Sequence, residues 1–144
     1  MSQITQKVLV TAIIIRDGKI LMQKRTDDLD SHRDKWTTPS GFVEVNEHPE
    51  DTIVREVKEE LNIDIKIKSV IPAIDSFPNH KDKFHMIYIA YECEIINGKT
   101  SNIDEDGDIS DIKWTRLDQL DDLDTIRGTM PPIREILRDV ELNS

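Results

Sequence analysis

One helix signal in the middle of the chain, with strand-type patterns before and after it, limits the folds that this sequence can adopt. Pro49 stands where a helix begins, because the missing N–H of proline costs nothing there, and acidic residues follow it in the first turn, where the helix dipole favours negative charge. Apolar side chains then recur at helical spacing and form one stripe: Ile53, Val54, Val57 and Leu61. Asn62 tolerates the left-handed backbone in which many helices end. The sequence therefore predicts an amphipathic helix that begins at Pro49 and ends at Asn62.

The patterns on both sides of this helix are those of strands. The apolar, β-branched run of residues 8–15 ends at Asp17-Gly18, a strong hairpin signal, and apolar residues resume at Ile20. Further strands are predicted at residues 63–67, 84–96 and 109–117. Asn97-Gly98 gives a second hairpin signal directly after the longest of them. Two hairpins exclude an all-parallel sheet.

The segments between and after these strands complete the expected order of elements. Residues 26–35 are polar and charged, which predicts a loop, and residues 36–41 form a short apolar-aromatic patch and turn. Two prolines introduce a terminal helix with apolar residues at helical spacing: Ile133, Ile136, Leu137 and Val140. Strands around one central helix, followed by a terminal helix, indicate an α/β or α+β sandwich.

Composition excludes several classes of function. The chain has 29 Asp and Glu against 19 Lys and Arg, a net charge of −10, so a basic face for long nucleic acid is not expected. No segment approaches the roughly 20 apolar residues of a membrane span, and the first residues lack the pattern of a secretory signal. Cys93 is the single cysteine, which forbids an internal disulfide and favours a cytoplasmic, reducing location. We interpret Cys93 as a small core residue.

Acidic residues are concentrated in and before the predicted helix. Glu56, Glu59 and Glu60 stand at i, i+3 and i+4, which puts three carboxylates on one helical face. Like charges so placed repel each other. A hard divalent cation, Mg²⁺ or Mn²⁺, removes that penalty, because it takes carboxylate oxygens and keeps waters for a phosphate substrate. A solvated helix face is the alternative interpretation of the three glutamates alone.

The residues around these glutamates follow a longer pattern. Gly41 is followed after five residues by Glu47, and after seven more by Arg55-Glu56-Val57-Lys58-Glu59-Glu60-Leu61-Asn62-Ile63. This resembles the Nudix box, Gly-x5-Glu-x7-Arg-Glu-(aliphatic)-x-Glu-Glu-x-Gly-(aliphatic), except that Asn62 stands where the family usually has Gly. The segment Trp36-Thr-Thr-Pro-Ser-Gly-Phe-Val-Glu44 is similar to the one that commonly leads into the box, with Ser40 in place of a Gly. With the order of elements, the resemblance covers residues 1–144 as one Nudix domain.

The resemblance implies a fold and an activity. The fold is an α/β/α sandwich with a mixed sheet, one box helix and a C-terminal helix. The activity is that of a Nudix pyrophosphohydrolase: Mg²⁺-dependent hydrolysis of a diphosphate bond in a nucleoside triphosphate, ADP-ribose or a nucleotide sugar, by a metal-activated water. The alternatives are a non-catalytic, nucleotide-sensing Nudix-like domain and an isomerase of the isopentenyl diphosphate type. Many relatives are dimers, so a homodimer is one option.

The resemblance also implies roles for particular residues. The metal ligands are the Gly41 carbonyl and three box carboxylates: Glu56, Glu59 and Glu60. Glu47 and Arg55 look like a supporting pair that orients the loop and the helix. The general base is a box glutamate or a carboxylate of the later acidic loop, where Asp108 is the first candidate and Glu105 the second. The alternative for that loop is a solvated acidic turn.

Three further residues are candidates for substrate contacts on their chemistry alone. Trp36 and Phe84 offer rings that stack on a base or ribose, and the alternative for each is a packing role. Arg25, at the end of the second predicted strand, is a candidate to meet a phosphate, with a solvated strand end as the alternative.

Overall fold

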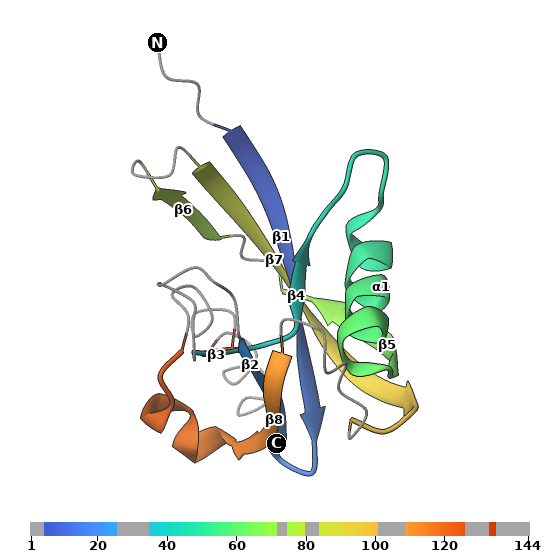
Figure 1. Ribbon diagram of the computed structural model, residues 1–144, viewed down its shortest axis with the longest axis vertical. Helices are drawn as coiled ribbons and strands as arrows, with labels where there is room; N and C mark the ends of the chain where they lie inside the picture. The colour runs from blue at the N-terminus through green and yellow to red at the C-terminus, as the bar shows by residue number, and fades with distance from the viewer. Residues whose placement is uncertain are drawn as a thin grey trace.

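The long strand β1 (Thr5–Arg16) organises the sheet, because it pairs with three other strands along its length. The computed structural model describes residues 5–25, 35–71, 75–79, 84–100, 109–125 and 133–134. The first part of β1 runs parallel to β7 (Phe84–Asn97), its middle pairs antiparallel with β4 (Ser40–Phe42), and its end pairs antiparallel with β2 (Lys19–Arg25). Figure 1 shows β1 and β7 side by side through the centre of the molecule.

The remaining described strands extend the sheet on both sides. The strands β5 (Asp64–Val70) and β6 (Asp75–Asn79) pair antiparallel with β7. The strands β3 (Trp36–Thr37) and β8 (Ile109–Arg116) pair antiparallel with β2. The sheet is therefore mixed, and the predicted α/β class is confirmed.

Hydrophobic side chains fill both faces of this sheet. One cluster lies against the helix α1 (Pro49–Leu61) and contains Val10, Ala12, Ile14, Leu21, Ile53, Val57, Leu61, Ile63, Ile65, Tyr91 and Cys93. The other lies on the side of the 3-10 helix η1 (Leu117–Asp122) and contains Ile13, Ile20, Met22, Ile71, Ala90, Leu120 and Ile133. Successive residues of β2 alternate between the clusters, as the period of a strand requires. Figure 1 shows α1 and η1 on different sides of the strands.

The ends of α1 lie where the sequence predicts them, but its buried stripe is narrower. Asn62 adopts the left-handed conformation (φ 55, ψ 37), and its N–H donates to the carbonyl of Lys58 at 3.0 Å. Val54 was expected in the stripe and is instead 36% exposed. Thr52 is fully buried in its place, because its hydroxyl donates to the carbonyl of His48 and to the carboxylate of Glu47.

The first predicted hairpin is confirmed and the second is wrong. Asp17 and Gly18 both have positive φ and connect β1 to β2. The next described strand after the Asn97-Gly98 turn, β8, does not pair with β7, which pairs with β1 on one edge as far as Cys93 and with β5 and β6 on the other. Strand β8 pairs with β2 instead. A Cβ at Gly98 would lie 2.8 Å from the carbonyl oxygen of Asn62, so this turn packs against the end of α1.

The terminal helix is described only at its start. Residues 133–134 are helical, and the rest of the predicted helix lies outside the described residues. Ile133 is fully buried in the second cluster, as its place in the predicted apolar stripe requires. In the described part of the chain, no helix has the length and apolar character needed to cross a membrane.

Cys93 has the predicted core position. Its side chain is buried in the first cluster, and this burial raises the pKa of the thiol to about 12. A thiol that stays protonated at neutral pH is a poor nucleophile and a poor metal ligand.

Candidate active site

Strand β4 fixes the loop that precedes α1. Gly41 pairs with Val10 of β1, so the start of this loop is anchored to the central strand. A Cβ at Gly41 would lie 2.3 Å from Cγ and 2.5 Å from Cδ of Glu56. The Glu56 side chain therefore lies directly against the Gly41 backbone, and only a glycine leaves room for it.

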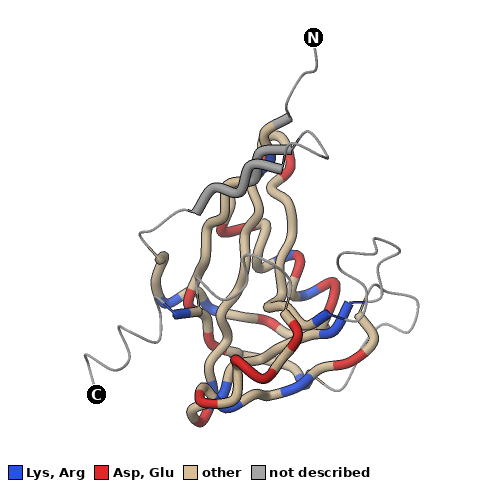
Figure 2. The backbone as a smooth tube through the Cα atoms, turned by 90° about the vertical axis from the view of Figure 1, so that its left-hand side faces the viewer, with Lys and Arg blue, Asp and Glu red and all other residues tan. Residues whose placement is uncertain are grey.

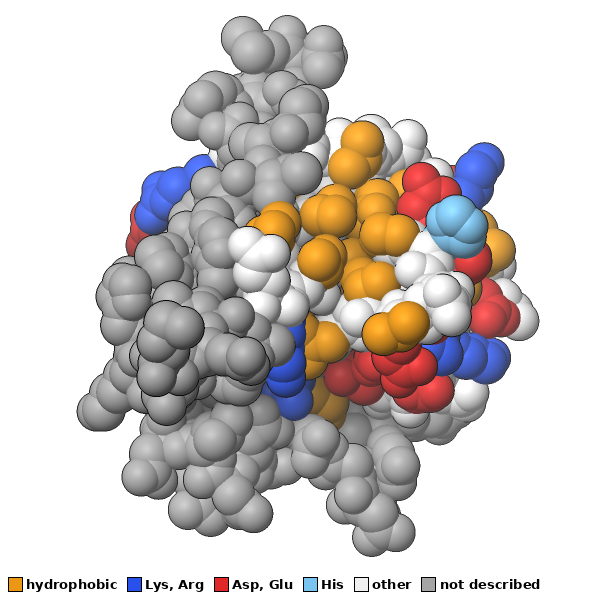
Figure 3. Space-filling model, turned by 90° about the horizontal axis from the view of Figure 1, so that it is seen from above, with side chains coloured by type: hydrophobic (Ala, Val, Ile, Leu, Met, Phe, Trp, Pro, Cys, Tyr) orange, Lys and Arg blue, Asp and Glu red, His pale blue; other side chains and the backbone are white. Residues whose placement is uncertain are grey.

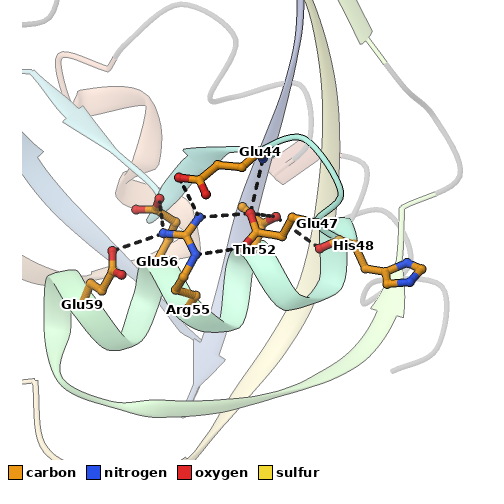
Figure 4. Close-up of polar contacts among 7 residues, drawn as sticks. All are labelled: Glu44, Glu47, His48, Thr52, Arg55, Glu56 and Glu59. Atoms are coloured by element: carbon orange, nitrogen blue, oxygen red, sulfur yellow. Dashed lines mark hydrogen bonds and ion pairs between the residues drawn. The ribbon is translucent and has the colours of Figure 1, made fainter.

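Arg55 stands at the centre of a group of carboxylates (Figure 4). Its guanidinium binds Glu47 in a bidentate manner, with Nε 2.9 Å from Oε2 and Nη2 3.1 Å from Oε1. Nη1 lies 3.1 Å from Oε1 of Glu56 and 3.3 Å from Oε2 of Glu59. Glu44 lies farther away, at 3.9 Å from Nη2. One guanidinium thus ties the loop before the helix to two of the three box glutamates.

Glu47 is held in its charged form by this arrangement. The hydrogen bonds from Arg55, and after them the hydrogen bond from the Thr52 hydroxyl at 2.7 Å, lower the pKa of Glu47 from 4.5 to about 2. The hydrogen bond to Glu47 in turn raises the pKa of Arg55, so the pair stays ionised at any pH at which the protein works. Glu47 and Arg55 are therefore in direct contact, and their role in supporting the loop and helix stays a prediction.

The depressed pKa of Glu47 predicts a pH dependence of stability. Because the folded-state pKa lies below the unfolded value, this carboxylate stabilises the fold above about pH 4.5, and the contribution is lost as the pH falls towards 2. We expect Glu47→Gln to flatten the dependence of the urea unfolding midpoint on pH in this window. Glu50→Gln, an exposed change in the first turn of the same helix, is the control and should keep the slope of the parent. An unchanged slope in Glu47→Gln would contradict the assignment.

The three box glutamates differ in their surroundings. The Glu56 side chain is 20% exposed, and its burial raises its pKa. The Glu59 side chain is 60% exposed, so it is free to turn about its own bonds. Glu60 is half-buried, and its Oε2 accepts a hydrogen bond of 3.1 Å from Nε2 of Gln23. Within the ranges that the structure describes, no three His, Cys, Asp or Glu side chains meet in a geometry that would hold a metal ion.

The donor atoms themselves fit a hard divalent cation. Glu56, Glu59 and Glu60 share one turn of α1, and all their donors are carboxylate oxygens, the kind that Mg²⁺ and Mn²⁺ prefer. The missing side chain at Gly41 lets the backbone of β4 lie directly against the Glu56 side chain. A bound cation would offset the burial of charge that raises the pKa of Glu56.

The described surface combines acidic and apolar side chains. Figure 2 shows that the described Lys and Arg positions lie among Asp and Glu positions. Figure 3 shows hydrophobic side chains gathered on one face, with acidic side chains at their border. Phe42 and Val45, in and after β4, are among the exposed large hydrophobic residues.

The structure describes two of the three candidate substrate residues in full. Arg25 is half-buried at the end of β2, two residues after Gln23, and therefore lies within about 7 Å along the strand of the residue that contacts Glu60. Trp36 is half-buried and packs against the second hydrophobic cluster, with Nζ of Lys24 at 5.8 Å from its ring. Phe84 begins β7, and its side chain is outside the described part.

The sequence did not predict Gln23 as a site residue, and two residues that it did predict lie outside the described part of the chain. Glu105 and Asp108, the candidate general bases of the later loop, lie outside the described residues. Gln23 lies between the apolar residues of β2 and Lys24, and no local pattern marks it. Its contact with Glu60 joins residues 37 positions apart, which only the fold brings together.

The comparison with protein families decides what kind of domain this is. The model of the NUDIX domain matches residues 6–139. The chain belongs to the Nudix family. The predicted resemblance to this family is thereby confirmed for nearly the whole sequence.

Relatives of this Nudix domain carry the names of hydrolases. It is 36% identical over 92 residues to "ADP-ribose pyrophosphatase" of Methanocaldococcus jannaschii, a match that covers 64% of this chain and 53%, about half, of that protein. It is 28% identical over 124 residues to "Nucleoside triphosphatase NudI" of Escherichia fergusonii, with 81% of this chain and 88% of that protein covered. The prediction of a Nudix hydrolase is confirmed at the level of enzyme class.

A solved structure supports the same fold. A NUDIX hydrolase from Nitrosomonas europaea superimposes with a TM-score of 0.80 at 17% sequence identity, over 94% of this chain and 90% of that one. At this identity the likeness concerns the fold, which agrees with the α/β class predicted from the sequence.

Proposed function

We propose that this Nudix domain hydrolyses a diphosphate bond in a nucleoside diphosphate derivative, with Mg²⁺ or Mn²⁺ as its cofactor. The observation that carries the proposal is the packing of the Glu56 carboxylate against Gly41, at the head of a helical face that also bears Glu59 and Glu60. A half-buried carboxylate beside two others is costly unless positive charge neutralises them, and the Arg55 guanidinium is shared among Glu47, Glu56 and Glu59. An enzyme that must hold a metal-bound diphosphate has a reason to keep this arrangement.

The cation would be held by the Gly41 carbonyl and the carboxylates of Glu56, Glu59 and Glu60. When bound, it polarises phosphoryl oxygens, lowers the pKa of a bound water and stabilises the charge of the transition state. Glu59 is the ligand that has to move, because its carboxylate lies on Arg55 and its side chain is 60% exposed. Arg55 holds the helix and the preceding loop together through Glu47 while the Glu59 side chain turns.

Other residues of the chain serve the substrate and the attacking water in this proposal. Arg25 neutralises a phosphate, since its strand also carries the residue that binds Glu60. Glu105, Asp108 or a box glutamate takes the proton of the attacking water. The apolar surface that borders acidic side chains suits a nucleoside attached to a charged diphosphate (Figure 3).

The names of the relatives narrow the substrate. An ADP-ribose pyrophosphatase and a nucleoside triphosphatase are among them, so we propose ADP-ribose or a nucleoside triphosphate, with nucleotide sugars as the next class. We also propose a cytoplasmic location, which agrees with the buried, protonated thiol of Cys93.

A panel assay tests the proposal. The full chain is incubated with Mg²⁺ or Mn²⁺ and with ADP-ribose, the common nucleoside triphosphates and nucleotide sugars, and the nucleotide products are separated by anion exchange. We expect at least one substrate to be cleaved to a nucleoside monophosphate, with rates that vanish when a chelator removes the metal. Glu60→Gln serves as the matched inactive control. If no panel member is turned over faster than by that control, the hydrolase proposal is wrong.

A further inference from the structure

Gln23 is a fully buried amide in a place where the surrounding chain is apolar. It follows Ile20, Leu21 and Met22 in β2, and like them it is 0% exposed. Its backbone pairs with Thr37 of β3 on one side and Ile112 of β8 on the other. A leucine or methionine at this position would match its neighbours in character and burial. The amide therefore has some function other than filling the core.

The nitrogen of this amide is hydrogen-bonded to Glu60, and its oxygen has no hydrogen-bond partner in the part of the chain that the structure describes. Nε2 donates to Oε2 of Glu60 at 3.1 Å, and it must be the nitrogen that faces this carboxylate, because an ionised carboxylate only accepts. Oε1 is buried and has no hydrogen-bond partner among the described residues. An unsatisfied buried oxygen destabilises a fold. Gln23 is thus a core residue that lowers the stability of the fold, and the one hydrogen bond described for its side chain goes to a box glutamate.

We propose that Gln23 is a positioning residue for metal binding: its N–H holds one oxygen of the Glu60 carboxylate, so that the other oxygen is directed to the cation. This inference rests on the proposed function, because it assigns a partner to one of the metal ligands proposed there. A carboxylate ligand has two oxygens and free rotation about its last bonds, and a fixed donor on one oxygen removes that freedom before the cation arrives. Hydrogen bonds of this kind to a ligand commonly change metal affinity by about 10- to 100-fold.

The test measures metal binding directly and needs no turnover. Mn²⁺ is titrated into the full chain without nucleotide, and free Mn²⁺ is followed by electron paramagnetic resonance. We expect Gln23→Met, which keeps the length of the side chain and removes the donor, to raise the Kd for Mn²⁺ about 10- to 100-fold. The melting temperature without metal should stay equal or rise, because the unsatisfied Oε1 is gone. Gln23→Glu, which sets an acceptor against Glu60, should weaken binding at least as much.

A matched control separates this role from general packing. Thr115 is also buried in the sheet, and its hydroxyl has no partner in the described part of the chain. Thr115→Val should change the melting temperature without changing the Kd for Mn²⁺. If Gln23→Met binds Mn²⁺ as tightly as the parent while Glu60→Gln binds it weakly, the positioning role is wrong and the metal site stands. If Glu60→Gln binds Mn²⁺ as tightly as the parent, the proposed metal site itself is wrong.

Discussion

We expect Glu60→Gln to lower the rate of the proposed diphosphate hydrolysis by at least about 10²-fold while the protein stays folded, a loss typical of removing one catalytic group. The amide has the shape of the carboxylate but lacks its charge, and a neutral oxygen is a weak ligand for Mg²⁺. The fold survives because the new side chain still offers an oxygen to Nε2 of Gln23. Glu59→Gln has the same effect on the rate, and its 60% exposed side chain makes it the safer change for stability.

The measurement is the steady-state rate on the best substrate of the panel, together with a thermal melt of each variant. Glu50→Gln is the control, because it removes one acidic group from the same helix outside the three box positions, and it should keep the rate of the parent. If both box variants retain the parent rate, the three glutamates are a solvated face and the metal ligands lie elsewhere.

We expect Gly41→Ala to have an effect of similar size although it removes no functional group. The added methyl group falls 2.3 Å from Cγ and 2.9 Å from Oε1 of Glu56, so the carboxylate is displaced from the Gly41 backbone. The atoms that clash belong to a flexible side chain, so the backbone of β4 keeps its pairing with β1. We expect the hydrolysis rate to fall by about 10²-fold, as for loss of the Glu56 ligand itself.

Two comparisons identify the cause of this loss. The double variant Gly41→Ala/Glu56→Gln should be no slower than Glu56→Gln, since two changes that act through one carboxylate do not add. Gly18→Ala is the matched control: nothing lies within 4 Å of its new Cβ, but its φ of +74 strains any other residue. It should lower the melting temperature and leave the rate unchanged. Additive losses in the double variant would place the effect of Gly41→Ala outside Glu56.

Local signals predicted those parts of the fold that short stretches of sequence decide. Pro49 and Asn62 mark the ends of α1, because each has a backbone property that the helix interior does not tolerate. Asp17 and Gly18 likewise accept the positive φ of a tight hairpin. The second hairpin signal was wrong because the next described strand, β8, pairs with β2, a strand distant in sequence that no local signal identifies as its partner.

In the site, too, local sequence predicts some contacts and only the fold creates others. The spacing of Glu47, Arg55 and Glu56 follows from one loop and one helix, so a linear motif contains their contacts. Gln23 approaches Glu60 from another layer of the sandwich, and its neighbours in sequence predict only a buried strand. The predicted burial of Val54 was wrong for a related reason. The hydroxyl of Thr52 has two hydrogen-bond acceptors nearby, so Thr52 takes the buried position that apolar spacing assigned to Val54.

The parallel ladder between β1 and β7 has a consequence for how the protein is made. Thr5 pairs with Phe84 and Ile14 with Cys93, so the N-terminal strand finds its longest partner only after most of the polypeptide has left the ribosome. Until then only the opposite edge of β1 has partners, β4 and β2, and closing so long a loop is entropically slow. The pairing of β1 with β7 is therefore a late step of folding, and until then one edge of an apolar strand is exposed to neighbouring chains.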